Sequence, residues 1–247
     1  MDPGTRLTDM MCAKTDEEKR DMEKVPYSSV VGSLLYLSTG TRPDIAYAVG
    51  EVSRFMKNPG RGHWTAVKHL LRYLKGTVDW GIQFGGPGAD LTVQGYSDAD
   101  WGGAQDRRST TGYVFMLAGG PVSWRSKRQK SVALSTMEAE YMSLCDAAQE
   151  AIWMARLMVD LIGQAAVPKA IVIHEDNQGC REYAKNHVLH GRAKHIDIRY
   201  HFIREKVAEG AIEVVECAGV NMLADILTKP VKRDQFQELA GRMGMTA

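Results

Sequence analysis

Four acidic residues of this 247-residue chain occupy positions where local structure would bring carboxylates together. Asp98 ends a segment rich in β-branched and aromatic residues, and Asp176 follows a second strand-like segment. If these strands are parallel neighbours, both carboxylates emerge at one sheet edge, where ligand sites form in open α/β sheets. Glu140 lies near the start of a long predicted helix, and Asp225 lies in a short helix before Thr228-Lys229-Pro230.

Such a group of acids has a recognisable chemistry. Crowded carboxylates repel and raise one another's pKa unless a cation neutralises them. Oxygen ligands suit Mg²⁺ or Mn²⁺, and two such ions can hold both the attacking and the leaving oxygen of a phosphodiester. The pattern therefore indicates a metal-dependent nuclease. The alternative is that these four are helix caps and surface groups, as most of the 30 acidic residues must be.

Composition limits the other function classes. The net charge is only +1, so contacts with nucleic acid must use local basic patches. The four cysteines form no C-x-x-C pair, which favours reduced thiols over disulfides or zinc. The N-terminus is polar, and the longest apolar run is interrupted and too short to cross a bilayer. We expect a protein without a membrane span that is not secreted and resides in a cytoplasmic particle or the nucleus.

The pattern along the chain predicts four parts. Residues 1–24 are polar and are predicted to be a flexible leader. Residues 25–84 show helical periodicity in three short segments and predict a small helical subdomain. Residues 85–90 contain Gly85-Gly86-Pro87-Gly88 and are predicted to be a linker.

Residues 91–247 predict an α/β domain. Strands are expected over 91–98, 111–117, 122–125, 170–174 and 212–217, with a long helix over 136–162. Weaker helices are expected over 178–186 and 193–208, and helical segments interrupted at Pro230 close the chain. This order favours a mixed sheet covered by helices.

Six motifs occur in order from residue 96 to residue 229. They are Tyr-Ser-Asp-Ala-Asp-Trp-Gly-Gly (96–103), Arg-Ser-Thr-Thr-Gly-Tyr-Val-Phe (108–115), Leu-Ser-Thr-Met-Glu-Ala-Glu-Tyr (134–141), Glu-Asp-Asn-Gln (175–178), Lys-His-Ile-Asp-Ile-Arg-Tyr-His-Phe-Ile-Arg-Glu (194–205) and Leu-Ala-Asp-Ile-Leu-Thr-Lys (223–229). Together they resemble the ribonuclease H domain of copia-type LTR retrotransposon Pol polyproteins. Upstream, residues 31–37 and 41–49 resemble the last, helical part of the preceding reverse transcriptase.

This resemblance implies a ribonuclease H-like fold, a five-stranded mixed sheet flanked by helices. It also implies an endonuclease that hydrolyses the RNA strand of an RNA–DNA hybrid with two Mg²⁺ (or Mn²⁺) ions and leaves 5′-phosphates. The family's metal-binding acids correspond to Asp98, Glu140, Asp176 and Asp225. Asp98 would bridge the ions, Asp225 would lie near the metal that activates water, and Glu140 and Asp176 would hold the other. The implied partner is the rest of the Pol polyprotein.

Neighbouring acids and histidines need separate interpretation. Glu138 stands three residues after Ser135 at the start of the long helix, and is predicted to complete a capping box with the Ser135 backbone N–H. Asp100, Glu175 and Asp197 are interpreted as solvated. Cellular ribonucleases H carry a mobile histidine between the last strand and the last helix, but residues 218–224 contain none. His195 and His201 could replace it, although a solvated or capping role is the stronger interpretation.

Two basic groups are candidates for binding a phosphate backbone. One precedes the long helix and the other lies near residue 200. Their members are Arg125, Lys127, Arg128 and Lys130, and Arg192, Lys194, Arg199 and Arg204. Asn177 and Gln178 could read the minor groove or cap the following helix.

Two other functions stay open. An inactive or domesticated copy would bind nucleic acid or protein without cutting, which a cleavage assay would reveal. An integrase-like strand transferase would need three acids ending in Asp and Glu, and the order Asp–Glu–Asp–Asp fits ribonuclease H better.

Overall fold

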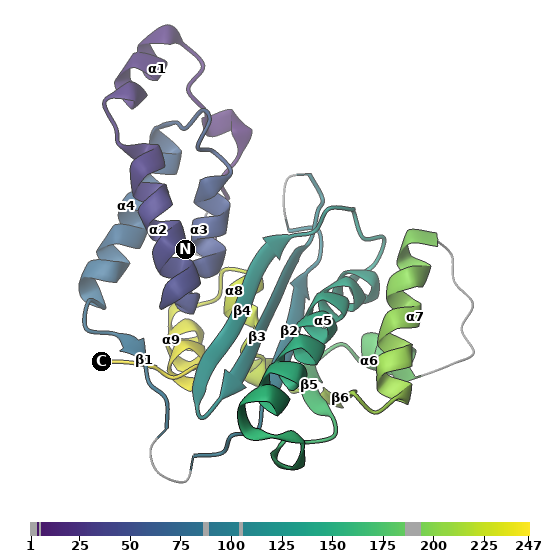
Figure 1. Cartoon of the computed structure of the whole chain (residues 1–247). Coiled ribbons are helices and arrows are strands. Elements are labelled where there is room, and N and C mark those ends of the chain that lie inside the picture. Colours follow the sequence, from purple (N-terminus) through teal and green to yellow (C-terminus); the bar gives the residue numbers. More distant parts are fainter. Residues whose placement is uncertain (1–3, 5, 86–88, 104–105, 186–193) are drawn as a thin grey trace.

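The computed structural model describes residues 4, 6–85, 89–103, 106–185 and 194–247. For residues 166, 194–198 and 200 only the backbone is described. A group of N-terminal helices stands beside a mixed sheet that carries helices on both faces (Figure 1).

Three helices form the centre of the N-terminal subdomain, as predicted. They are α2 (Tyr27–Gly40), α3 (Ala46–Ser53) and α4 (Arg61–Gly76). Their apolar faces meet in one core that includes Val31, Leu34, Val49, Val52 and Val67. Helical spacing of these residues places them on one face of each helix, so packing rather than intrinsic propensity stabilises these short helices.

Residues 6–24 are not the flexible leader that the polarity of the first 24 residues predicts. The short helix α1 (Asp16–Glu23) begins with a capping box between Thr15 and Glu18. Leu7, Ala13 and Met22 are buried in the same core as α2–α4. Single apolar residues separated by polar ones have no periodicity along the sequence, so only their tertiary contacts show that this stretch is part of the subdomain.

The predicted fold class is confirmed: a five-stranded mixed sheet follows the helical subdomain. Its strands are β2 (Gln94–Asp100), β3 (Thr110–Leu117), β4 (Gly120–Arg128), β5 (Ile171–Glu175) and β6 (Ile212–Glu216). They lie in the order β4-β3-β2-β5-β6, with β2, β3 and β4 antiparallel and β2, β5 and β6 parallel. The sheet therefore brings the carboxyl ends of β2 and β5 side by side.

Helices cover both faces of this sheet (Figure 1). The long helix α5 (Thr136–Ile162) has the predicted bounds and covers one face together with α6 (Gln178–Lys185) and α7 (Lys194–Ala208). The other face receives α8 (Asp225–Thr228) and α9 (Arg233–Arg242). Successive side chains of β3 point to opposite faces of the sheet. Phe115 therefore packs toward α5, and Val114 packs toward α8 and α9. Within the described residues, no helix has the length and apolar character needed to cross a membrane.

The helical subdomain has its own core, and the segment that follows its last helix packs against the sheet domain. The strand β1 (Gly81–Ile82) pairs with β7 (Met245–Thr246) near the end of the chain. Trp80 and Ile82 pack against the core of α8 and α9, and the Trp124 indole donates to the Ser38 carbonyl oxygen at 2.7 Å. Contacts therefore join the parts on either side of the predicted linker at 85–90, of which residues 86–88 lie outside the described residues.

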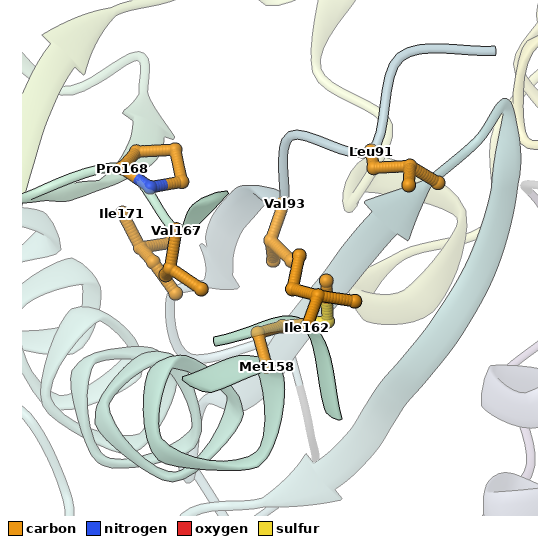
Figure 2. A pocket seen from close by; sticks show the side chains of 7 residues that line it. All are labelled: Leu91, Val93, Met158, Ile162, Val167, Pro168 and Ile171. Atoms are coloured by element: carbon orange, nitrogen blue, oxygen red, sulfur yellow. The ribbon is translucent and has the colours of Figure 1, made fainter. Parts of the chain in front are cut away.

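A small pocket lies beneath the C-terminal end of α5. Seven apolar side chains line it, namely Leu91, Val93, Met158, Ile162, Val167, Pro168 and Ile171 (Figure 2). It is at the amino ends of β2 and β5, away from Asp98 and Asp176. Since it offers no ionisable side chain, the pocket is a packing feature rather than a catalytic one.

Gly112 allows α8 to lie directly on the sheet. It is the cross-strand partner of Asp98 on β3. A β-carbon at this position would lie 2.5 Å from Thr228 Cγ2 and 3.0 Å from Leu227 Cβ. Both contacts are shorter than packed side chains tolerate, so a glycine is required wherever α8 approaches this strand so closely.

We expect Gly112→Ala to lower the free energy of unfolding by about 1–3 kcal/mol, because α8 must move away from β3. Urea denaturation measures this. Gly32→Ala is the matched control: its β-carbon would meet no atom within 4 Å, and alanine in the exposed middle of α2 should stabilise by about 0.5–1 kcal/mol. Equal stability of Gly112→Ala and the wild type would contradict the close-packing argument.

Candidate metal centre

Three of the four predicted acids meet at the carboxyl ends of the parallel strands. Asp98 is on β2, and Asp176 directly follows β5, which pairs with β2 in parallel. Glu140 reaches the same place from the second turn of α5. One carboxylate oxygen from each residue lies within 4.8 Å of the other two. This spacing suits one divalent cation held by several oxygens.

Glu140 is the acid whose burial is hardest to explain without a cation. Its side chain is 4% exposed, and its Oε2 atom has no hydrogen-bond partner. Burial raises its pKa well above the ordinary value, and the charges of Glu175 and Asp98 raise it further. Burying a polar group without a hydrogen bond costs roughly 2–7 kcal/mol of free energy, and burying an unpaired charge costs more. The donor set and this orphaned oxygen therefore fit a divalent metal ion.

Asp98 is held from two elements. Its Oδ2 atom accepts a hydrogen bond from the Thr228 hydroxyl in α8. Its backbone oxygen accepts from the Ser143 hydroxyl in α5 at 2.8 Å. Helices on opposite faces of the sheet thus fix the carboxylate at the centre of the cluster.

Asp225 lies on the other side of Asp98, outside the three-acid group. It opens α8, and its Oδ1 atom is 2.8 Å from the Lys229 ammonium, which is also 3.5 Å from Asp98 Oδ2. Burial raises the pKa of Asp225 to about 6, with a further contribution from Asp98 that Lys229 opposes. The lysine thus joins the fourth acid to the other three.

Glu175 is buried rather than solvated, which corrects the sequence-based interpretation. Its side chain is 0% exposed, its Oε2 atom has no partner, and its Oε1 atom accepts from the Asn177 backbone N–H at 3.1 Å. Burial raises its pKa well above the ordinary value. The period of two along β5 places it on the same face as Ile171 and Ile173, so the strand pattern contained a signal for burial.

Glu138 caps α5, although not through the predicted hydrogen bond. Ser135 Oγ accepts from the Glu138 backbone N–H at 3.2 Å, as expected. The Glu138 carboxylate accepts from the Leu134 N–H at 2.8 Å, one residue before the predicted Ser135 N–H. The two glutamates nevertheless differ as expected, because Glu138 has a backbone partner and Glu140 joins the acidic cluster.

Asn177 and Gln178 form local contacts. Asn177 Oδ1 accepts from the Cys180 backbone N–H at 2.9 Å and caps the start of α6. Gln178 Nε2 donates to Glu182 Oε1 at 2.6 Å on the exposed side of that helix. Of the two interpretations left open, the structure therefore shows helix capping for Asn177.

The first predicted basic group and one member of the second, Arg199, line one polar pocket. Its lining includes Arg125, Lys127 and Arg128 from β4, and Arg199 from α7. Arg125 lies 3.7 Å from Asp146, and Arg128 pairs with Asp106 at 3.2 Å. Arg192 lies outside the described residues. So do the side chains of Lys194, His195 and Asp197, and His201 is exposed on α7.

Three residues of this centre have no role in the sequence-based set. They are Glu175, Thr228 and Lys229. The signal for Lys229 was available, because it stands four residues after Asp225, a spacing at which acid and base pair on a helix. Thr228 carries no such signal, because its partner Asp98 is 130 residues away in sequence.

Comparison with known proteins identifies relatives of the chain. The chain is 48% identical over 241 residues to the retrovirus-related Pol polyprotein from transposon TNT 1-94 of Nicotiana tabacum, a match covering 97% of this chain and 18% of the polyprotein. It is 45% identical over 220 residues to that of transposon RE2 of Arabidopsis thaliana, covering 89% of this chain and 15% of that protein. The chain is therefore a homologue of a segment of copia-type retrotransposon Pol polyproteins. It thus spans less than a fifth of the length of these Pol polyproteins.

Other matches cover parts of the chain. A stretch of 134 residues is 54% identical to secreted RxLR effector protein 161 of Plasmopara viticola, covering 54% of this chain and 94% of that protein. Among solved structures, a ribonuclease H1 isolated from compost matches with a TM-score of 0.42 and 15% identity, covering 60% of this chain and 97% of that one. No protein-family model matches the chain.

Asp225 should make the stability of the metal-free protein depend on pH. Its folded pKa of about 6 exceeds the ordinary 3.8, so the folded state retains a proton that the unfolded state releases. The stabilisation is complete only below the ordinary pKa of 3.8 and is lost as the pH rises through 6. The difference between the two pKa values corresponds to about 3 kcal/mol, of which about 2 kcal/mol is lost between pH 4 and 7.

Urea denaturation in a chelator from pH 4 to 7 measures the difference between wild type and Asp225→Asn. The wild type should lose about 2 kcal/mol relative to the variant over this range. Asp234→Asn, an exposed position in α9, is the control and should follow the wild type. Parallel curves for wild type and Asp225→Asn would rule out the raised pKa.

Proposed function

We propose that this chain is a metal-dependent ribonuclease H that hydrolyses the RNA strand of RNA–DNA hybrids during retrotransposon reverse transcription. The observation that carries the proposal is the convergence of Asp98, Glu140 and Asp176 within 4.8 Å at a sheet edge. Homology to copia-type Pol polyproteins supports a role in the copying of retroelement nucleic acid.

The residues present fit two divalent ions, Mg²⁺ or Mn²⁺. Asp98, Glu140 and Asp176 would hold one, and Asp98 with Asp225 would hold the other. When bound, the ions supply an activated water and neutralise charge on the phosphodiester, which leaves 5′-phosphate products. The chain's own contribution is to fix the acids, since Thr228 holds the Asp98 carboxylate and Ser143 holds its backbone.

The polar pocket of β4 and α7 is proposed to bind the hybrid. Its lining brings Arg125, Lys127, Arg128 and Arg199 together from segments that are about 70 residues apart. Clustered cations track a phosphate backbone and release its counterions. Lys194 and Arg192, together with Asn177 and Gln178, remain candidate contacts from the sequence.

The N-terminal helices are proposed to be the end of the reverse transcriptase. Residues 25–84 form the helical subdomain and 91–247 the ribonuclease domain in this proposal, and the partner is the rest of the Pol polyprotein. Packing of Trp80 against the core of α8 and α9 would hold the nuclease in a fixed relation to that partner. The proposed location is a cytoplasmic particle or the nucleus.

A labelled RNA–DNA hybrid tests the activity. The wild type should cut the RNA strand with Mg²⁺ or Mn²⁺, be inactive in a chelator, and spare a DNA duplex. Asp98→Asn and Glu140→Gln should slow cleavage by about 100-fold or more, because several kcal/mol of charge stabilisation are lost. Glu138→Gln is the matched control, two residues from Glu140, and should retain activity since its carboxylate binds only the Leu134 N–H.

Two results would contradict this proposal. Activity retained by Glu140→Gln but lost by Glu138→Gln would reverse the assignment of the glutamates. Hybrid binding without cleavage under any metal condition would instead identify an inactive or domesticated copy that serves as a binding module.

Hybrid affinity should fall steeply with salt because of the basic pocket. Substitution of Arg125, Lys127 and Arg199 by glutamine should weaken binding and reduce the slope of log affinity against log salt by about 1–3. Arg128 is left unchanged because it pairs with Asp106. The control replaces Lys14, Lys24 and Lys57, which are exposed on the helical subdomain. Equal slopes for the pocket variant and the wild type would remove the pocket from the interface.

A further inference from the structure

Lys229 stands between two of the four acids. Its Nζ atom is 2.8 Å from Asp225 Oδ1 and 3.5 Å from Asp98 Oδ2. The two carboxylate side chains are 8% and 2% exposed, whereas the lysine side chain is 35% exposed. A cation is therefore already present between the two acids proposed to share a metal ion.

Local structure fixes the lysine in this place. Lys229 follows the last residue of α8 and is four residues after Asp225, so acid and base lie one turn apart. Its backbone is extended, with φ −145° and ψ 156°, as expected for a residue before a proline. The preceding Thr228 donates to Asp98. Two consecutive side chains thus contact the carboxylate at the centre of the cluster.

The ammonium contacts two carboxylates that have little access to water. Opposite charges at 2.8 Å and 3.5 Å attract strongly in such a place. Lys229 therefore offsets the mutual repulsion of Asp98 and Asp225.

We propose that Lys229 is a built-in counter-ion. In the metal-free chain its ammonium neutralises Asp98 and Asp225, and a divalent cation that binds these two carboxylates must displace it. This inference rests on the proposed function, because it assumes that the acids bind metal. Lys229 is thus a positioning residue that keeps the acids together before the metal ion binds.

A cavity beside Lys229 can accommodate its side chain after displacement. Lys229 lines a cavity of about 610 Å³ between the helical subdomain and the C-terminal segment. The side chain therefore has room to move away from the two acids when a metal ion binds them.

The test compares Lys229→Met with the wild type at pH 8. Calorimetric titration with Mn²⁺ and Mg²⁺ should show binding at least about tenfold tighter in the variant, because no ammonium competes. In a chelator the variant should melt about 5 °C or more below the wild type, since the acids lose their counter-ion. Saturating metal should remove most of that difference. Lys232→Met, at an exposed position three residues on, is the control and should match the wild type in all three measurements.

Two further variants protect the test against a folding failure. Lys229→Arg keeps the charge and should bind metal no more tightly than the wild type. Lys229→Gln replaces Lys229→Met if the latter does not fold in a chelator, because its amide can still donate to the carboxylates. Recovery of folding on addition of metal supports the proposal, whereas variants that stay unfolded with metal overturn it.

The remaining outcomes distinguish a failure of the proposed role of Lys229 from a failure of the proposed nuclease function. Metal binding that is unchanged or weaker in Lys229→Met, with binding in the wild type abolished by Asp98→Asn, overturns the role of Lys229 and leaves the nuclease proposal intact. A deficit in melting temperature that is equal with and without metal also overturns it, because Lys229 would then be an ordinary structural ion pair. A wild type that binds no divalent ion overturns both proposals.

Discussion

Mutual repulsion among carboxylates is the constraint on which this structure depends. The parallel pairing of β2 and β5 brings Asp98 and Asp176 to one edge, and α5 adds Glu140 from the face above. Glu175 is buried directly beside them. Acids so close in a dry place raise one another's pKa, and only positive charge relieves this. The structure supplies some of that charge from Lys229, and the proposed metal ions would supply the rest.

Packing on the far face of the sheet controls the same centre. The helix α8 carries Asp225 and Thr228 and precedes Lys229, so its distance from β3 sets their position relative to Asp98. Gly112 permits that distance. The same layer packs against Trp80 and Ile82, which follow the N-terminal helices. The segment that follows the helical subdomain therefore packs against the helix that carries Asp225 and Thr228.

Charge on this molecule is local. A net charge of +1 gives no overall attraction to nucleic acid, and the polar pocket gathers its arginines and lysines from β4 and α7. Several of these cations have acidic neighbours, such as Asp146 beside Arg125 and Asp106 beside Arg128. Ion pairs of this kind hold the arginine side chains in place at the pocket that is proposed to bind the hybrid.

The sequence by itself indicated the family resemblance, the fold class, the bounds of α5 and three acids that meet, Asp98, Glu140 and Asp176. Strand alternation, helix periodicity and ordered motifs are local properties of the chain, so they can be read without the structure. Tertiary structure alone decided the rest. Leu7 and Ala13 are buried in a polar stretch because α2–α4 cover them. Thr228 meets Asp98 across 130 residues. Lys229 contacts Asp98 only because α8 packs on β3, the strand next to the one that carries Asp98. Such contacts depend on which faces of the helices and the sheet pack together, and the periodicity of a single segment cannot predict that pairing.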